Sequence, residues 1–296
     1  MFPEQPVVKI VSRQSKMPFL VARVLTLLLL VLATAARAAT LQPTDDPAVS
    51  PVWKKVRASL FQDRVIKPAP AGLLSLEAPT RAIDAATVPI AIRTGFAQTP
   101  NSFVSKLYLI IDANPSPISA IFELIPESGR VDIETRVRVD EYSHVRAIVE
   151  MNDGQLYATT RFVKASGGCS APAGGDVQAA LAAFGKMRLR VDGDLKGREP
   201  VRAELLINHP NHSGLAMDQF SRQFTPAHYV RKVDVSYAGK PVFSADLDFS
   251  ISENPNFRFY FLPQGQGQSQ GEMRVTALDS RDMRFELLDA LRAPAP

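Results

Sequence analysis

The stretch HVRAIVEMNDGQLYATTRFVK, residues 144–164, contains two runs of strand-forming residues with a turn signal between them. The runs HVRAIVEMN (144–152) and QLYATTRFVK (155–164) are rich in β-branched and aromatic residues, which favour strands. Asn152, Asp153 and Gly154 separate them, and these residue types adopt the positive φ angles that tight hairpin turns require. The stretch therefore predicts an antiparallel β-hairpin.

Runs of the same kind lie on both sides of this hairpin. In RVDIETRVRV (130–139), Val131 to Val139 face one way at every second position, while Asp132, Glu134, Arg136 and Arg138 face the other. Strands this short and regularly spaced, without helices between them, predict an all-β fold made of antiparallel sandwiches. The other predicted strands are 87–93, 104–113 and 119–126 before the hairpin, and 186–193, 201–208, 229–237, 241–249, 257–263 and 272–278 after it.

We therefore expect one sandwich over 70–165 and a second over 186–290, joined by a connector over 166–185. The two should pack against each other as separate bodies and not as one continuous sheet. Residues 39–69 are expected to form a leader and a short helix, which begins with Ser50 as N-cap and Pro51 as first helical residue. Trp53, Val56, Leu60 and Phe61 share one face of this helix. A second short helix is predicted at 176–185, capped by Asp176 and ended by Gly185.

The first 38 residues resemble a secretory signal peptide. The apolar run VLTLLLLVLATAA (24–36) follows basic residues and ends in Ala36-Arg37-Ala38, ahead of a cut before Ala39. The run is shorter than the roughly 20 residues of a membrane-spanning helix, so export is favoured over anchoring. Met1 and Met17 are both possible starts.

The segment 1–38 carries five of the 34 basic residues and one of the 30 acidic residues, so 29 of each remain in the mature chain. A mature chain of zero net charge predicts neither nucleic acid nor an anionic membrane as partner.

Cys169 is the single cysteine and lies in FVKASGGCSAPAGGD (162–176). A lone thiol forms no intramolecular disulfide. It follows Gly167 and Gly168 and has no large apolar neighbour within two positions, so we expect an exposed thiol on a flexible, glycine-rich connector. If the thiol is exposed, Cys169→Ser should leave the melting temperature nearly unchanged. A loss of several degrees would mean that the cysteine is packed, and the carrier interpretation would then fail at its central residue.

Both halves resemble subunits of the bacterial sulfur-oxidation system. DGQLY with FVK, GGC, NPSP, ETRVRV and YSHVRAIVEMNDG are similar to the carrier subunit SoxY. LLINHPNHSG and FTPAHYVRKVDVSYAGKPVFSADLDFSISENPNFRFYF are similar to its partner SoxZ. The whole chain most resembles the fused SoxYZ-like carriers associated with quinoprotein dehydrogenases. The resemblance implies two immunoglobulin-like β-sandwiches.

The resemblance also implies a periplasmic carrier, not an enzyme. Its Cys169 would hold a sulfur intermediate, with Gly167 and Gly168 as a flexible arm, and partner oxidoreductases would act on the cargo. No cofactor is implied. The family's carrier ends soon after its cysteine, whereas here Ser170-Ala171-Pro172 follows and the chain continues. The thiol is therefore on a loop fixed at both ends, which shortens its reach.

Two other classes of function remain open. Cys169 could be the nucleophile of a thiol transferase or peroxidase. Such chemistry generally requires a lowered thiol pKa, for example from a nearby cation, and the nearest cation in sequence, Lys164, is five positions away. Alternatively, the chain could be a plain immunoglobulin-like interaction module. His209, His212 and His228 could suggest a metal, but the proline in HPNH and the lack of a ligand motif favour a structural role; we predict no metal site.

Overall fold

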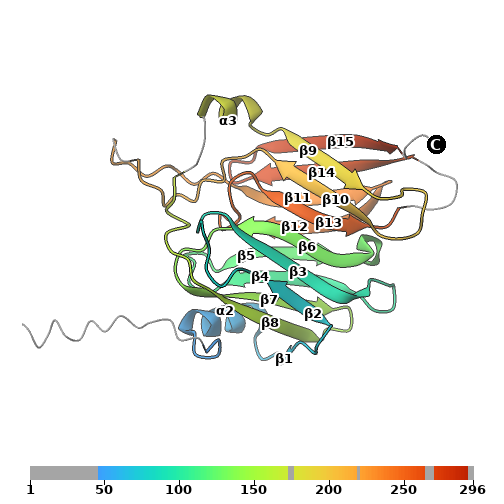
Figure 1. Cartoon of the computed structure of the whole chain (residues 1–296), viewed down its shortest axis with the longest axis horizontal. Coiled ribbons are helices and arrows are strands. Elements are labelled where there is room, and N and C mark those ends of the chain that lie inside the picture. The colour runs from blue at the N-terminus through green and yellow to red at the C-terminus, as the bar shows by residue number, and fades with distance from the viewer. Residues whose placement is uncertain (1–45, 173–176, 219–220, 264–269, 293–296) are drawn as a thin grey trace, which may run out of the picture. The chain divides into compact units, whose positions relative to one another are not determined.

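The computed structural model describes residues 46–172, 177–218, 221–263 and 270–292, so the predicted signal peptide lies outside the described residues. Two β-sheets dominate it, and the predicted all-β class is confirmed (Figure 1). The nine-stranded sheet has the order β1-β8-β7-β4-β5-β12-β11-β14-β15, and the six-stranded sheet has the order β2-β3-β6-β13-β10-β9. Among the described residues, no helix is long and apolar enough to cross a membrane.

The first half of the chain supplies strands β1 to β8 and the second half β9 to β15. Their bounds are β1 Ile66–Pro68, β2 Leu74–Glu77, β3 Val88–Ala97, β4 Val104–Ile111, β5 Ile118–Leu124, β6 Arg130–Val137, β7 Ser143–Met151, β8 Leu156–Val163, β9 Met187–Asp192, β10 Val201–Ile207, β11 Val230–Tyr237, β12 Lys240–Leu247, β13 Asn256–Phe261, β14 Gln270–Asp279 and β15 Arg284–Arg292. The hairpin predicted around Gly154 is confirmed as the β7–β8 pair, and Gly154 has a φ of +83°.

Helix α2, Pro51–Phe61, forms where the sequence predicted it. The Ser50 side chain accepts a hydrogen bond from the Trp53 amide at 3.1 Å, so the predicted N-cap is confirmed. Val56 and Phe61 are buried against Tyr108 and Ile148 of the nine-stranded sheet. Because successive strand residues point to opposite faces, β4 and β7 can bury one set of side chains under this helix and the alternate set in the main core.

The two halves join edge to edge and share both sheets. Strand β5 pairs with β12 antiparallel over five residue pairs, from Leu124 with Phe243 to Ala120 with Leu247. In the other sheet, Glu134 of β6 pairs with Arg258 of β13. The expectation of two sandwiches packed as separate bodies is therefore wrong: each half contributes a sandwich-like pair of sheets, but the sheets are continuous. Pairing satisfies backbone groups that an exposed edge strand would leave open.

The core is continuous across this junction. Phe122 of the first half lies 6.0 Å from Phe243 and 6.1 Å from Phe257 of the second, measured between ring centroids. Phe243 in turn packs edge-on against Phe259 at 5.0 Å. These rings belong to one cluster of buried residues drawn from both sheets.

The second predicted helix is present as α3, Val177–Ala183, whereas its predicted cap, Asp176, lies outside the described residues.

Candidate functional site: the Cys169 segment

Cys169 is buried, with no exposed surface. The prediction of an exposed thiol is therefore wrong. That prediction rests on the lack of large apolar neighbours in sequence, whereas the burial comes from residues that are far away along the chain. The segment Gly167–Ser170, which we call the cysteine segment, lies against the residues that follow β6 and against a loop of the second half.

On the first-half side, the cysteine segment runs along Val139 and Asp140. The Gly167 amide donates to the Asp140 carbonyl at 2.6 Å, and the Gly168 amide donates to the Val139 carbonyl at 3.1 Å. The Cys169 amide donates to Asp140 Oδ1 at 3.2 Å. Asp140 is itself fixed, because its amide donates to Asn114 Oδ1 at 2.9 Å. Three successive amides of the cysteine segment are thus held by two residues.

The two glycines before the thiol have different structural roles. A Cβ on Gly168 would lie 2.1 Å from the Ala85 carbonyl oxygen and 2.6 Å from the Val139 carbonyl oxygen, so only glycine fits. Gly167 has room for a side chain but has a φ of +78°, which glycine adopts most easily. The predicted flexibility of Gly167 and Gly168 stays a prediction. At Gly168, the fold requires the backbone of the cysteine segment to pass close to the backbones of Ala85 and Val139.

The second half of the chain covers the segment from the other side. The Ser213 hydroxyl donates a short hydrogen bond to the Cys169 carbonyl and accepts one from the Leu215 amide at 3.1 Å. Ser213 belongs to the loop between β10 and β11, and it is buried. Both halves of the chain therefore contact the residue that carries the thiol.

The environment keeps the thiol protonated. Burial raises the pKa of Cys169 to about 12; the negative charge of Asp140 acts in the same direction, and the Arg138 guanidinium opposes it. Because the thiolate is the nucleophile, a thiol with this pKa reacts slowly at neutral pH. The structure thus gives no sign of an activated nucleophile in the docked segment.

Arg138 is a further residue of the site, and sequence reasoning missed it. The alternation of 130–139 places its side chain on the polar face of a strand, but β6 ends at Val137 and Arg138 is only 3% exposed. Its Nη1 donates to the Gly168 carbonyl and its Nη2 to the Asn211 carbonyl, both at 3.3 Å. The guanidinium therefore bridges the cysteine segment and the second half.

Two of the three candidate histidines meet, together with an acid from the far end of β14. His228 Nε2 lies 2.7 Å from Asp279 Oδ2, and His209 Nε2 lies 3.6 Å from the same oxygen. This buried group could geometrically hold an ion, and His212 is not part of it. Burial lowers the pKa of His209 to about 4, with the neighbouring His228 acting in the same direction.

The hydrogen bonds of His209 support the structural interpretation. Its Nδ1 accepts from the Asn211 amide at 3.0 Å, so in the neutral ring the proton lies on Nε2, which is 3.6 Å from Asp279 Oδ2 and has no hydrogen-bond partner among the described residues. Asn211 in turn holds the second-half loop through Ile251 and Val230. The histidine cluster therefore shapes the loop that contacts Cys169, and the absence of a metal stays a prediction.

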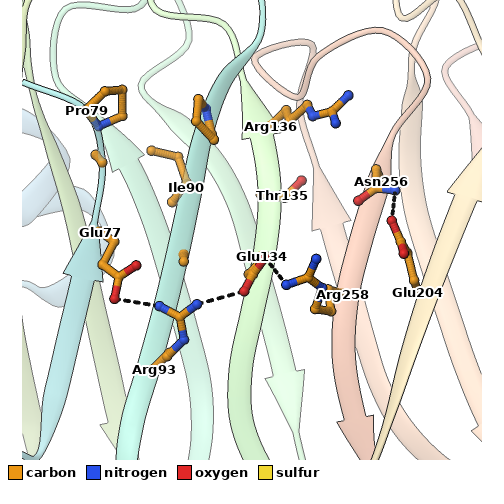
Figure 2. A pocket seen from close by; sticks show the side chains of 13 residues that line it. Glu77, Pro79, Ile90, Arg93, Glu134, Thr135, Arg136, Glu204, Asn256 and Arg258 are labelled. Carbon is orange, nitrogen blue, oxygen red and sulfur yellow. Dashed lines mark hydrogen bonds and ion pairs between the residues drawn. The ribbon is translucent and has the colours of Figure 1, made fainter. Parts of the chain in front are cut away.

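A pocket of about 460 Å³ lies over the outer face of the six-stranded sheet, where the two halves meet (Figure 2). Arg93 forms ion pairs with Glu77 and Glu134 at 2.7 Å, and Arg258 of the second half pairs with Glu134 at 2.6 Å. These charges satisfy one another across the junction. Glu134, one of the charged residues that alternate along 130–139, is thus held in ion pairs on this face of the sheet.

Two family models match successive parts of the chain. Residues 57–169 match the sulfur oxidation protein SoxY, and residues 189–287 match the sulphur oxidation protein SoxZ. The SoxY match ends at Cys169. No curated protein sequence matches the chain.

Solved structures that the chain matches include the sulfur carrier protein SoxY from Chlorobium limicola f thiosulfatophilum, at 24% identity and a TM-score of 0.33, covering 38% of this chain and 91% of that one. Another is a superoxide reductase (neelaredoxin) from Ignicoccus hospitalis, at 14% identity and a TM-score of 0.28, covering 31% of this chain and 79% of that one.

The two matched domains are β domains of a sulfur-oxidation carrier, the class of protein to which this chain belongs. Within that class, a SoxY domain followed by a SoxZ domain in a single chain makes it a member of the fused SoxYZ-like family.

Proposed function

We propose that this chain is a periplasmic carrier that holds a sulfur-containing intermediate covalently on Cys169 and presents it to partner oxidoreductases. The observation that carries the proposal is the position of the single thiol. It is the last residue of the SoxY match and lies where both halves of the chain meet. The partners are enzymes of sulfur oxidation or of a quinoprotein dehydrogenase system. Export directed by the segment 1–38 would bring the carrier to the periplasm.

The docked state supports a protective role for the fold. A buried thiol with a pKa of about 12 resists adventitious oxidation, because susceptibility follows thiolate character and exposure. The segment is held mainly by a few hydrogen bonds, each contributing about 1 kcal/mol, so its release does not require unfolding of a sheet. Cargo would be attached in the released state and shielded in the docked state.

Attachment of thiosulfate illustrates the chemistry. The thiol loses one proton and a new S–S bond forms between Cys169 Sγ and the terminal sulfur of thiosulfate. The thiol and thiosulfate together give up two electrons, which pass to the acceptor of a partner oxidoreductase. The product is an anionic adduct, and a reductive or hydrolytic partner removes it in a later step.

The raised pKa argues against the rival interpretation of an autonomous transferase or peroxidase. Such enzymes lower the thiol pKa with a helix N-terminus or a cation. Here α3 begins at Val177, after the cysteine, and the opposing effect of Arg138 does not overcome burial and Asp140. A carrier needs no activation of its own, because the partner supplies it.

The test uses the purified mature chain with thiosulfate and an electron acceptor, with and without periplasmic extract. We expect a mass adduct on Cys169 only when extract is present, at one cargo per chain, and none on Cys169→Ser. Repeated turnover by the isolated chain that depends on Cys169 would replace the carrier with an enzyme.

A further inference from the structure

Arg138 carries a buried positive charge whose hydrogen-bonded partners are neutral. Its two terminal nitrogens donate to backbone carbonyls at 3.3 Å, which is at the long end for hydrogen bonds. Its Nε is buried and has no hydrogen-bond partner among the described residues. Arginine remains protonated in proteins, so the charge is permanent.

In the part of the chain that the structure describes, the hydrogen-bond partners of Arg138 are both backbone carbonyls, and no carboxylate forms an ion pair with it. Asp84, an acidic neighbour, accepts hydrogen bonds from the Ala86 amide at 2.8 Å and the Thr87 hydroxyl at 2.7 Å. Burial lowers the pKa of Arg138, and the nearby Cys169, Glu253 and Asp84 only partly oppose this effect. A buried charge without a paired anion is costly, so an anion brought to this place gains a strong interaction.

A pocket of about 460 Å³ adjoins Arg138. Arg138 and Arg136 line it from the first half, and Ala171 and Pro172 line it immediately beyond the cysteine segment. Two asparagines of the second half, Asn208 and Asn254, also line the pocket. Two carboxylates, Asp84 and Glu253, line it as well, so an anion must lie on the side of the arginines.

The position of Arg138 links this pocket to the cargo. Its Nη1 binds the carbonyl of Gly168, the residue directly before Cys169, and Arg138 is also one of the residues that line the pocket. A group extending from Cys169 Sγ by a few atoms, turned toward Arg138, would bring its end to the guanidinium. The volume greatly exceeds that of a sulfonate, given that one water occupies about 30 Å³.

We propose that Arg138 is the anion-binding residue of the carrier: it binds the negatively charged end of a sulfur chain attached to Cys169, in the pocket beside the cysteine segment. The proposal rests on the proposed function and specifies that the cargo is anionic. A sulfonate is the class of anionic group that fits the guanidinium and the pocket. A planar guanidinium pairs with the oxygens of such a group through two parallel hydrogen bonds. A neutral cargo receives no such stabilisation.

The test compares three methanethiosulfonate reagents that differ in charge: the 2-sulfonatoethyl, the 2-trimethylammonioethyl and the methyl reagents. Each converts the thiol to a mixed disulfide, releasing methanesulfinate and a proton. All three need the same release of the segment, so the ratio of anionic to cationic labelling rates reports charge recognition. The ratio in urea-unfolded protein corrects for intrinsic reactivity.

We expect the corrected ratio to fall about tenfold in Arg138→Gln. It should fall less in Arg138→Lys, which keeps the charge but not the two parallel hydrogen bonds of the guanidinium. Arg188→Gln, at an exposed position on β9, makes the same change in net charge and should leave the ratio unchanged. An equal ratio in wild type and Arg138→Gln would overturn the proposal.

A second measurement needs no variant and covers the case in which Arg138→Gln fails to fold. Wild-type protein labelled with each reagent is unfolded thermally. The sulfonate adduct should melt at a higher temperature than the methyl adduct, and the ammonium adduct at a lower one. Equal melting of the anionic and cationic adducts would overturn the Arg138 proposal alone. Failure of every reagent to label Cys169 in the folded chain would instead overturn the proposed attachment.

Discussion

Gly168 determines whether the thiol can dock, because two carbonyl oxygens occupy the space that any side chain would need. We predict that Gly168→Ala prevents docking and raises the rate of Cys169 labelling by a neutral maleimide by at least about tenfold, the equivalent of ~1.4 kcal/mol. Folding of the sheets should persist, since the contacts affected lie outside them.

Gly167→Ala is the matched control. Its positive φ costs roughly 1 kcal/mol for alanine, but the added methyl meets no backbone atom within 4 Å. Labelling should therefore rise less than in Gly168→Ala. Equal effects at both positions would mean that the two glycines act only as a flexible tether.

Cys169→Ser should destabilise the protein, whereas an exposed thiol would have left the melting temperature nearly unchanged. A buried thiol behaves as a small hydrophobic group, and a hydroxyl without a partner carries a desolvation cost of about 1–3 kcal/mol. We expect a loss of about 1–2 kcal/mol in urea unfolding, against less than about 0.5 kcal/mol for Ser170→Ala at an exposed position. Equal stability of Cys169→Ser and wild type would mean that the segment is not docked in solution.

The burial of Cys169 does not remove the carrier interpretation, because a docked and a released state can alternate. It does show that the thiol is not permanently exposed, which the sequence-based carrier interpretation had assumed. The sequence contains the glycines and the thiol, but their contacts with Asp140 and Ser213 span 29 and 44 positions. Local sequence patterns do not report contacts at such distances. The burial of Arg138 could not be predicted from the strand alternation either, because β6 ends at Val137, one residue before it.

At the scale of elements, the loop between β10 and β11 depends on neutral histidines. The ordinary pKa of 6.5 for His209 falls to about 4 in the folded protein because the ring is buried. Between these pH values the unfolded chain binds more protons, so stability rises with pH and is lost as the pH falls from about 6.5 to about 4. His212, whose pKa is also lowered by burial, contributes with the same sign.

We therefore predict that the free energy of unfolding falls between pH 7 and pH 5, by on the order of 2 kcal/mol. His209→Asn should be less stable at pH 7 but should show a shallower slope over this range, because the titrating ring is gone. Urea unfolding at several pH values measures both. Equal slopes in the two proteins would assign the pH dependence to other groups.

The strands themselves were largely predictable, because alternation and turn residues are local signals. The β7–β8 hairpin and the N-cap at Ser50 both follow from short stretches. Which strand lies beside which was not predictable in the same way. The edges of β5 and β12 carry no sequence mark of pairing, so the shared sheets appear only in three dimensions.

For the whole molecule, continuous sheets imply that the two halves unfold together. Phe122 is completely buried and contacts Phe243 and Phe257 across the junction. We predict that Phe122→Ala lowers stability by about 3–5 kcal/mol while calorimetry still shows one transition. Phe224→Ala, at a side chain that is 58% exposed, should cost little. Two separate transitions, with only one shifted by Phe122→Ala, would mean that the halves are independent.

Sulfur cargo on Cys169 is tested most directly by intact-protein mass spectrometry of the chain purified from its native host. We predict a population with added mass corresponding to sulfur or sulfonate groups, localised to the peptide containing Cys169 and removed by a thiol reductant. Cys169→Ser expressed in the same host should show none of it. A chain that is entirely unmodified while the host oxidises sulfur compounds would contradict the carrier role.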